Sequence, residues 1–269
     1  MSESAEIVLT NDDGIDSPGL SALYESLSEL ASVTVVAPAG DRSAVGRSIS
    51  GEVAVVDHEL GYAIEGTPAD CVVAALGELG PPGGPDLVVS GCNRGANLGE
   101  YALGRSGTIG AAVEAAFAGV PAIATSLYVP VEAGPFEEVD LDREGYTEAS
   151  RATRYLVAHA LEGELFERID YLNVNAPVPG EEPAPIELTR PSPRYEMDAA
   201  GDGERITLIN RVWERMSPET LPDPPGTDRR AVVEGRVSVT PLSIPQATVD
   251  DEGLGRLADG YLEWASGNR

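Results

Sequence analysis

Two hydrophobic patterns alternate along the first 175 residues: short apolar runs, and longer segments with apolar residues at helical spacing. The clearest helical segment places Leu20, Leu23 and Leu27 on one face and starts with Ser17 followed by a proline, a typical helix N-terminus. Further helices are predicted at Cys71–Leu79, which follows a second cap-and-proline pair, at Gly110–Gly119 and at Thr147–Leu161. Strands are predicted at Glu6–Thr10, Val33–Ala37, Asp86–Ser90, Pro121–Leu127 and Tyr171–Asn175.

Strands that alternate with helices favour an α/β fold, in which helices cover both faces of a mostly parallel sheet. Ligands of such sheets bind at the carboxyl ends of the strands. This rule directs attention to three loops, which begin at Asn11, Pro38 and Gly91.

The pattern changes after Pro177, where prolines become frequent and β-type runs appear. These runs are Ile186–Thr189, Arg205–Ile209 and Ala231–Thr240, and an amphipathic segment at Leu254–Trp264 predicts a last helix. We therefore divide the chain into a catalytic α/β core (1–176), a β-rich extension for oligomer contacts (177–245) and a C-terminal helix (246–269).

The first loop contains two adjacent carboxylates, Asp12 and Asp13, followed by Gly14. Neighbouring side chains of a strand point to opposite faces, so the two carboxylates converge only if the chain turns here, which a glycine permits. Converging carboxylates repel each other unless a cation or a shared proton lies between them, and hard ions such as Mg²⁺ or Mn²⁺ suit these oxygens. The alternative is a solvated turn without a ligand.

The other two loops supply hydroxyl groups, asparagines, glycines and arginines. In the first 142 residues the only basic side chains other than histidine are Arg42, Arg47, Arg94 and Arg105, and all four lie in or just after these loops. Arginine binds phosphate well because its planar fork donates two parallel hydrogen bonds. The segment Ser106-Gly107-Thr108 begins a predicted helix, whose free N–H groups also favour an anion.

The four arginines of the loops stand out because the chain as a whole is strongly acidic. The chain has 45 acidic and 18 basic residues, a net charge of −27, and every basic residue is arginine. Such a charge argues against duplex nucleic acid as a partner and predicts a halophilic source, with an ordinary acidic protein as the alternative. The sequence contains no run of about 20 apolar residues and no evident signal peptide, so we expect a cytoplasmic protein that does not span a membrane.

Carboxylates for a cation and arginines for an anion, at one edge of a sheet, predict metal-assisted phosphoryl chemistry. Negative charge that develops on the phosphoryl oxygens would be met by arginine, by Asn97 and by the backbone of Ser106–Thr108.

Together these loops resemble the SurE family, the survival-protein-E nucleotidases. The resemblance covers about the first 130 residues and rests on motifs that occur in the family's order. These motifs are Asn11-Asp12-Asp13-Gly14-Ile15 with Pro18-Gly19, Arg42-Ser43, Gly66-Thr67-Pro68-Ala69-Asp70-Cys71, Val89-Ser90-Gly91 with Asn93, Gly95 and Asn97-Leu98-Gly99, and Ser106-Gly107-Thr108.

The resemblance implies a Rossmann-like core with an extension exchanged between the subunits of a homodimer or homotetramer. It implies a phosphatase that uses one divalent metal ion, Mg²⁺ or Mn²⁺, to hydrolyse nucleoside 5′- and 3′-monophosphates. The family's metal ligands correspond to Asp12, Asp13, Ser43 and Asn93, and its phosphate contacts to Asn97 and Ser106-Gly107-Thr108.

Several questions stay open at this point. None of the three loops contains a histidine, so the general acid is unassigned, and we favour metal-activated water over a carboxylate nucleophile. Polyphosphate or another phosphomonoester is an alternative substrate. A non-catalytic nucleotide-binding protein is the alternative from another class, because open α/β sheets host many functions.

Overall fold

The computed structural model describes residues 4–130, 139, 141–163 and 165–244, so the helix expected at Leu254–Trp264 lies outside the described residues. Within the described part, nine strands form one sheet and two more form a hairpin. The strands are β1 (Glu6–Thr10), β2 (Ser32–Pro38), β3 (Val55–His58), β4 (Gly61–Ile64), β5 (Leu87–Arg94), β6 (Ala122–Tyr128), β7 (Tyr171–Pro177), β8 (Ile186–Leu188), β9 (Met197–Gly201), β10 (Ile206–Asn210) and β11 (Val237–Leu242). The helices are α1 (Pro18–Leu27), α2 (Pro68–Leu76), α3 (Glu100–Leu103), α4 (Gly107–Phe117), α5 (Thr147–Leu161) and α6 (Asp228–Val233), with the 3₁₀ helices η3 (Arg143–Tyr146) and η4 (Arg211–Arg215).

The sheet has the order β3-β4-β2-β1-β5-β6-β7-β11-β8. The six strands from β4 to β7 are mutually parallel, whereas β3 and β11 run antiparallel to their neighbours β4 and β7. The chain moves from β1 to one side for β2 and later to the other side for β5. The carboxyl ends of β1 and β5 therefore flank the switch point of the sheet, where α/β proteins bind ligands.

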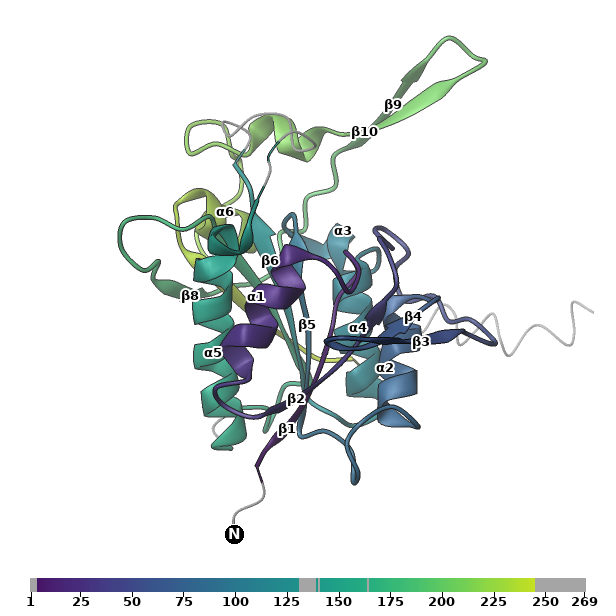
Figure 1. The fold of residues 1–269 in the computed structure, drawn as a ribbon. Coiled ribbons are helices and arrows are strands. Elements are labelled where there is room, and N and C mark those ends of the chain that lie inside the picture. Colours follow the sequence, from purple (N-terminus) through teal and green to yellow (C-terminus); the bar gives the residue numbers. More distant parts are fainter. Residues whose placement is uncertain (1–3, 131–138, 140, 164, 245–269) are drawn as a thin grey trace, which may run out of the picture.

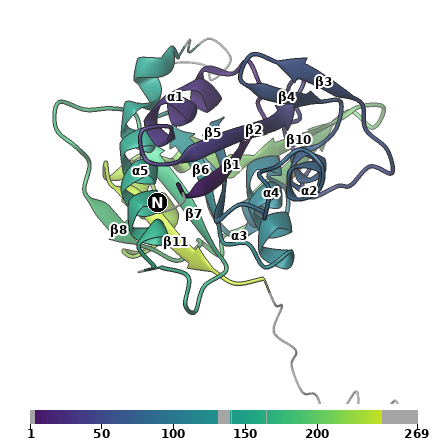
Figure 2. The same cartoon turned by 60° about the horizontal axis from the view of Figure 1, so that its bottom comes forward.

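Successive side chains of the central strands point to opposite faces of the sheet and so contribute to two separate hydrophobic cores. In β1, Ile7 and Leu9 belong to one buried cluster and Val8 to the other. The first cluster includes α1 and α5, and the second includes α2 and α4. Figures 1 and 2 show these two pairs of helices on opposite faces of the sheet, which confirms the predicted layered α/β architecture.

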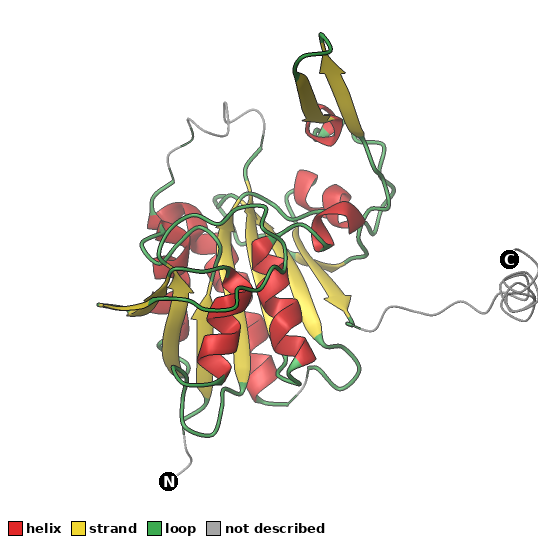
Figure 3. Ribbon diagram, turned by 90° about the vertical axis from the view of Figure 1, so that its right-hand side faces the viewer, coloured by secondary structure: helices red, strands yellow, loops and turns green. Residues whose placement is uncertain are grey.

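The region after Pro177 contributes both to the sheet and to a separate arm. Strands β11 and β8 extend the sheet beyond β7. Strands β9 and β10 form an antiparallel hairpin that extends away from the sheet and its helices (Figures 1 and 3). The β-rich character expected for this region is confirmed, and its division from the core at residue 177 stays a prediction.

The prediction of one β run over Ala231–Thr240 is wrong in its first half. Residues up to Val233 form α6, and the strand starts only at Val237. The β-branched residues Val232 and Val233 suggested a strand, but Val232 and Ala231 are buried by the helix, so tertiary packing overrides local preference.

Candidate active site

The first loop approaches the second so closely that a side chain at Gly14 would not fit. Gly14 has φ of +98°, and a Cβ there would lie 3.0 Å from the Cα of Gly40. Asn11 fixes the turn by donating from Nδ2 to the carbonyl of Gly14 (2.8 Å) and to Oγ of Ser17 (2.7 Å), the residue that caps α1. The turn after β1, expected from the glycine, is thus built by side chains of the same segment.

Asp12 is buried between this turn and the start of α4. Its side chain has 3% exposure, and its Oδ1 accepts a 2.6 Å hydrogen bond from Oγ1 of Thr108. A Cβ at Gly107 would lie 2.9 Å from Cβ of Asp12, so the helix N-terminus needs a glycine at this contact. The structure therefore brings together Asp12, Gly107 and Thr108, three of the predicted site residues.

Backbone hydrogen bonds hold the second and third loops against the first. The N–H of Arg42 donates to the carbonyl of Asp12 (2.7 Å), and the N–H of Arg94 donates to Oδ2 of Asp13 (2.7 Å). The three loops that sequence reasoning placed at one edge of the sheet are thus in direct contact.

The two carboxylates share an environment that disfavours their negative charge. Burial raises the pKa of Asp13 to about 7, and repulsion from Asp12 and Asp41 adds to this effect, against the hydrogen bond from Arg94. Burial also raises the pKa of Asp12, although hydrogen bonds from Thr108 partly offset it. A cation beside these oxygens would favour their ionised forms.

Ser43 and Asn93 supply neutral oxygens near these carboxylates. Oγ of Ser43 donates to Oδ1 of Asp41 (2.6 Å), and Nδ2 of Asn93 donates to the carbonyl of Gly95 (2.5 Å). With its amide nitrogen used in this way, Asn93 keeps Oδ1 available as a ligand. Asp41, which precedes Arg42 in the second loop, is a neighbour that sequence reasoning did not single out.

The oxygen atoms of these four side chains suit a hard divalent cation as ligands. No three His, Cys, Asp or Glu side chains gather as a metal site among the described residues, so a cation here would rely on Asp12 and Asp13 together with hydroxyl, amide and water oxygens. Oxygen-only sets completed by water are typical of Mg²⁺. The residues present therefore fit the predicted ion.

Asn97 is positioned by the end of β7. Its N–H donates to Oδ1 of Asn175 (2.8 Å), and its carbonyl accepts from Nδ2 of Asn173 (2.9 Å) and of Asn175 (3.1 Å). Its own Nδ2 donates to Oγ of Ser126 at 2.9 Å. Sequence reasoning did not single out Asn173 and Asn175; the signal was that two polar residues alternate within a strand whose other residues are apolar, and the structure buries all of them.

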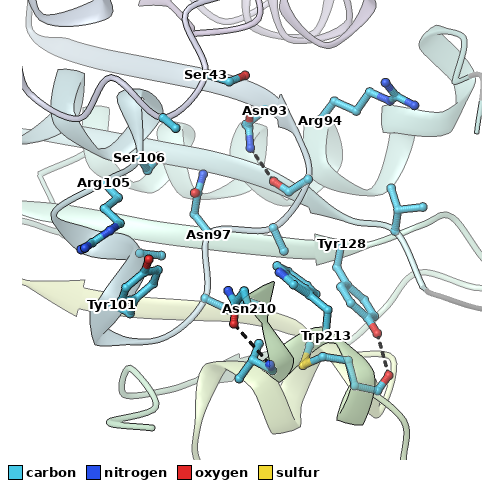
Figure 4. A pocket seen from close by; sticks show the side chains of 18 of the residues that line it. Ser43, Asn93, Arg94, Asn97, Tyr101, Arg105, Ser106, Tyr128, Asn210 and Trp213 are labelled. Carbon is cyan, nitrogen blue, oxygen red and sulfur yellow. Dashed lines mark hydrogen bonds between the residues drawn. The ribbon is translucent and has the colours of Figure 1, made fainter. Parts of the chain in front are cut away.

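A cavity of about 690 Å³ opens beside these loops. Its lining includes five of the predicted site residues, Asp12, Ser43, Asn93, Asn97 and Ser106. Arg94 and Arg105 also line it, whereas Arg42 donates to the carbonyl of Gly66 and Arg47 pairs with Glu114 outside the cavity. Two of the four early arginines thus line the cavity, although the guanidinium group of Arg94 donates to the carbonyl of Val139 (2.5 Å) and points away from Asn93 in Figure 4.

The opposite side of the cavity comes from residues that sequence reasoning missed. Tyr128 at the end of β6, Asn210 at the end of β10, and Trp213 and Met216 from the segment that follows β10 line it (Figure 4). This segment lies more than a hundred residues after the loops in the chain, so no local pattern could have joined it to them.

The fold and the loops define a doubly wound, Rossmann-like α/β protein with a polar site at the switch point of its sheet. The chain belongs to the SurE family: the family model described as Survival protein SurE matches residues 7–198. None of the described helices is long and apolar enough to cross a membrane.

Close relatives cover nearly the whole chain. It is 60% identical to a protein of Natronomonas pharaonis over 95% of this chain and 99% of that protein, and 57% identical to one of Haloarcula marismortui over 95% and 94%. Both are named 5′-nucleotidase SurE. These organisms are halophilic archaea, which confirms the halophilic character predicted from the charge.

A solved structure shares the fold. The crystal structure of the SurE protein from Aquifex aeolicus superimposes with a TM-score of 0.72 at 32% sequence identity, over 96% of this chain and 99% of that one. The family resemblance and the Rossmann-like fold predicted from the loops are therefore both confirmed.

Proposed function

We propose that this chain is a metal-dependent phosphatase that hydrolyses nucleoside 5′-monophosphates to nucleoside and phosphate. The observation that carries the proposal is the cavity, whose lining joins the buried Asp12 and the oxygens of Ser43 and Asn93 to two arginines, Arg94 and Arg105. The relatives named 5′-nucleotidase SurE support the same substrate class.

Asp12, Asp13, Ser43 and Asn93 would hold one Mg²⁺ or Mn²⁺ ion. When bound, such an ion polarises a phosphoryl oxygen and lowers the pKa of a water molecule. Thr108 orients Asp12 through the 2.6 Å hydrogen bond, and the N–H of Arg94 orients Asp13 through the 2.7 Å one. Both carboxylates are therefore fixed before substrate arrives, which lowers the reorganisation needed during the reaction.

The phosphate group would lie between this acidic end and the two arginines. Arg105 can donate to its oxygens, and Arg94 and Asn97 line the same cavity. Arg105 lies with its Cζ 4.0 Å from the centre of the Tyr101 ring, which restrains its guanidinium group. The positive charge of an arginine beside the reacting phosphoryl group would stabilise the negative charge of the transition state more than that of the free substrate.

The proposal includes nucleoside 3′-monophosphates as further substrates and keeps polyphosphate and other phosphomonoesters as alternatives. The remaining alternative is a protein that binds nucleotides in this cavity without hydrolysing them. Such a protein would gain little from two adjacent carboxylates, the buried Asp12 and the half-buried Asp13, beside its anion site, since they repel the ligand.

The test is phosphate release from AMP by the purified protein in concentrated salt. We expect no turnover in EDTA and restored turnover on addition of Mg²⁺ or Mn²⁺. Replacing Asp12→Asn should lower kcat by at least about 100-fold, because the variant loses a charged ligand while keeping the shape of the side chain.

Asp16→Asn is the matched control, since its carboxylate lies in the same segment, is 85% exposed and contacts His58. It should leave turnover unchanged. Full activity of Asp12→Asn would refute the metal assignment, and a folded wild-type protein without turnover for any metal would favour the nucleotide-binding alternative. Relative kcat/KM for AMP, its 3′ isomer and short polyphosphate would rank the substrates.

A further inference from the structure

The cavity is chemically divided in a way that the phosphoryl reaction does not require. Its lining combines polar and charged residues, among them Asp12, Ser43 and Arg105, with the larger apolar or aromatic side chains of Tyr128, Val212, Trp213 and Met216. Figure 4 shows Trp213 and Tyr128 on the side of the cavity opposite Ser43 and Ser106. At about 690 Å³ the cavity is of the size that holds a whole small-molecule ligand and exceeds what a phosphate group and one ion would fill.

Trp213 stands out among these apolar and aromatic side chains. Its neighbours on the same turn, Val212 and Met216, are 6% and 3% exposed, whereas Trp213 keeps 38% of its surface exposed. A large aromatic side chain that lines a cavity and stays uncovered offers a flat apolar face to a ligand.

The turn that carries Trp213 is held in place from several directions. Oδ1 of Asn210 accepts from the N–H of Val212 (3.2 Å) at the start of η4, and the hydroxyl of Tyr128 donates to the carbonyl of Met216 (3.0 Å). Val212 is itself buried, and Met216 packs in a cluster with Leu98, Tyr128, Leu221 and Val232. Because Leu98 follows Asn97 directly, the same cluster joins the turn to the loop at the phosphate end.

We infer that Trp213, with the apolar surface around Tyr128 and Met216, forms the subsite for the nucleoside half of the substrate, the nucleobase stacking on the indole ring. This inference rests on the proposed function and gives the segment after β10 a role in substrate binding. Stacking uses the face of a base, which all nucleobases share, so the subsite accepts purines and pyrimidines alike.

The experiment compares AMP with ribose 5-phosphate, which carries the same phosphate ester without a base. In Trp213→Ala, kcat/KM for AMP should fall by about 10-fold or more, mostly through KM, because an alanine removes the stacking surface. The value for ribose 5-phosphate should change less than about 3-fold, since the phosphate end is untouched. Trp213→Phe keeps a ring and should retain most of the AMP activity.

Val73→Ala is the control, because Val73 is an exposed apolar residue of α2 that does not line the cavity and is 50% exposed. It should leave both substrates unaffected. Equal kcat/KM of the wild type for AMP and ribose 5-phosphate, or an equal loss for both in Trp213→Ala, would overturn the subsite while the phosphatase function stands.

Calorimetric titration with adenosine separates the subsite from the reaction, since it needs no turnover. Binding by the wild type that Trp213→Ala loses and Val73→Ala keeps supports the subsite even if neither phosphate ester is hydrolysed. Absence of adenosine binding by the folded wild type overturns it.

Discussion

At the scale of single residues, the contact between Gly107 and Asp12 sets the position of a carboxylate that the proposed reaction uses. A Cβ at Gly107 would lie 2.9 Å from Cβ and 3.0 Å from Oδ2 of Asp12. Gly107→Ala should therefore displace the Asp12 side chain and lower kcat for AMP by about 10-fold to 100-fold, because a displacement of about 1 Å at a catalytic group can cost this much.

Gly104→Ala provides a matched control for this substitution. Gly104 precedes the same helix by three residues, and a Cβ there would meet no atom within 4 Å. Its activity should equal that of the wild type. Unchanged activity of Gly107→Ala would contradict the close placement of Asp12 against α4.

Residues of the site differ in how far the sequence could reveal them. Asp12, Asp13 and Gly14 stand together at the end of a strand, and Asn97 and Ser106 lie in glycine-rich segments after another, so local pattern and the switch-point rule suffice for these. Asn175 could have been found only by asking why a buried strand carries polar residues. Trp213 gives no local signal, because its role depends on the chain returning to the cavity after β10.

At the scale of elements, the N-terminus of α2 can be predicted from the sequence, and its contribution to the free energy of unfolding can be measured. Thr67 caps the helix, and Asp70 completes a capping box by accepting from the N–H of Thr67 (2.8 Å). Asp70 also accepts from the N–H (2.7 Å) and hydroxyl (2.9 Å) of Ser50, a long-range contact that no local pattern contains.

These hydrogen bonds predict how stability depends on pH. Burial alone would raise the pKa of Asp70, but the hydrogen bonds from Thr67 and Ser50 outweigh it and hold the pKa below its ordinary value of 3.8. Because the folded chain binds this proton more weakly than the unfolded chain, the carboxylate stabilises the fold above pH 3.8. That contribution is lost as the pH falls through the lowered pKa of the folded state.

Asp70→Asn should accordingly reduce the free energy of unfolding by about 1–2 kcal/mol at neutral pH, with the difference from the wild type shrinking below about pH 4. Denaturant unfolding of both proteins in concentrated salt at several pH values would measure this. A difference that stays constant down to pH 2 would contradict the role given to the ionised carboxylate.

The element boundaries show why other features escaped prediction. Strand β3 carries exposed Val55 and Val56 at the edge of the sheet, so its apolar run has no buried partner face to mark it as a strand. The β-branched residues Val232 and Val233 predict a strand, whereas the structure places them in helix α6. In both places the arrangement of the whole sheet decides the structure, which local spacing does not contain.

At the scale of the whole molecule, the β9–β10 hairpin carries apolar side chains that its own chain leaves uncovered. It extends away from the sheet (Figure 3). Ile206 and Leu208 on β10 are 65% and 73% exposed. An isolated two-stranded hairpin is marginally stable in water, so an apolar hairpin of this kind needs a surface to pack on. We propose that it packs on a second copy of the chain in a homodimer or homotetramer, as the family resemblance implies.

Replacing Ile206 and Leu208 together by Asp should therefore lower the mass of the particle in solution, because charged side chains cannot be buried in an apolar contact without a large cost. Light scattering in concentrated salt, which screens the repulsion expected from a net charge of −27, would measure the mass. Val73→Asp is the control, since Val73 is an exposed apolar residue of α2, far from the hairpin in the sequence, and is 50% exposed. If the double variant kept the wild-type mass, or if the wild type were a monomer, the hairpin would have to be stabilised within its own chain.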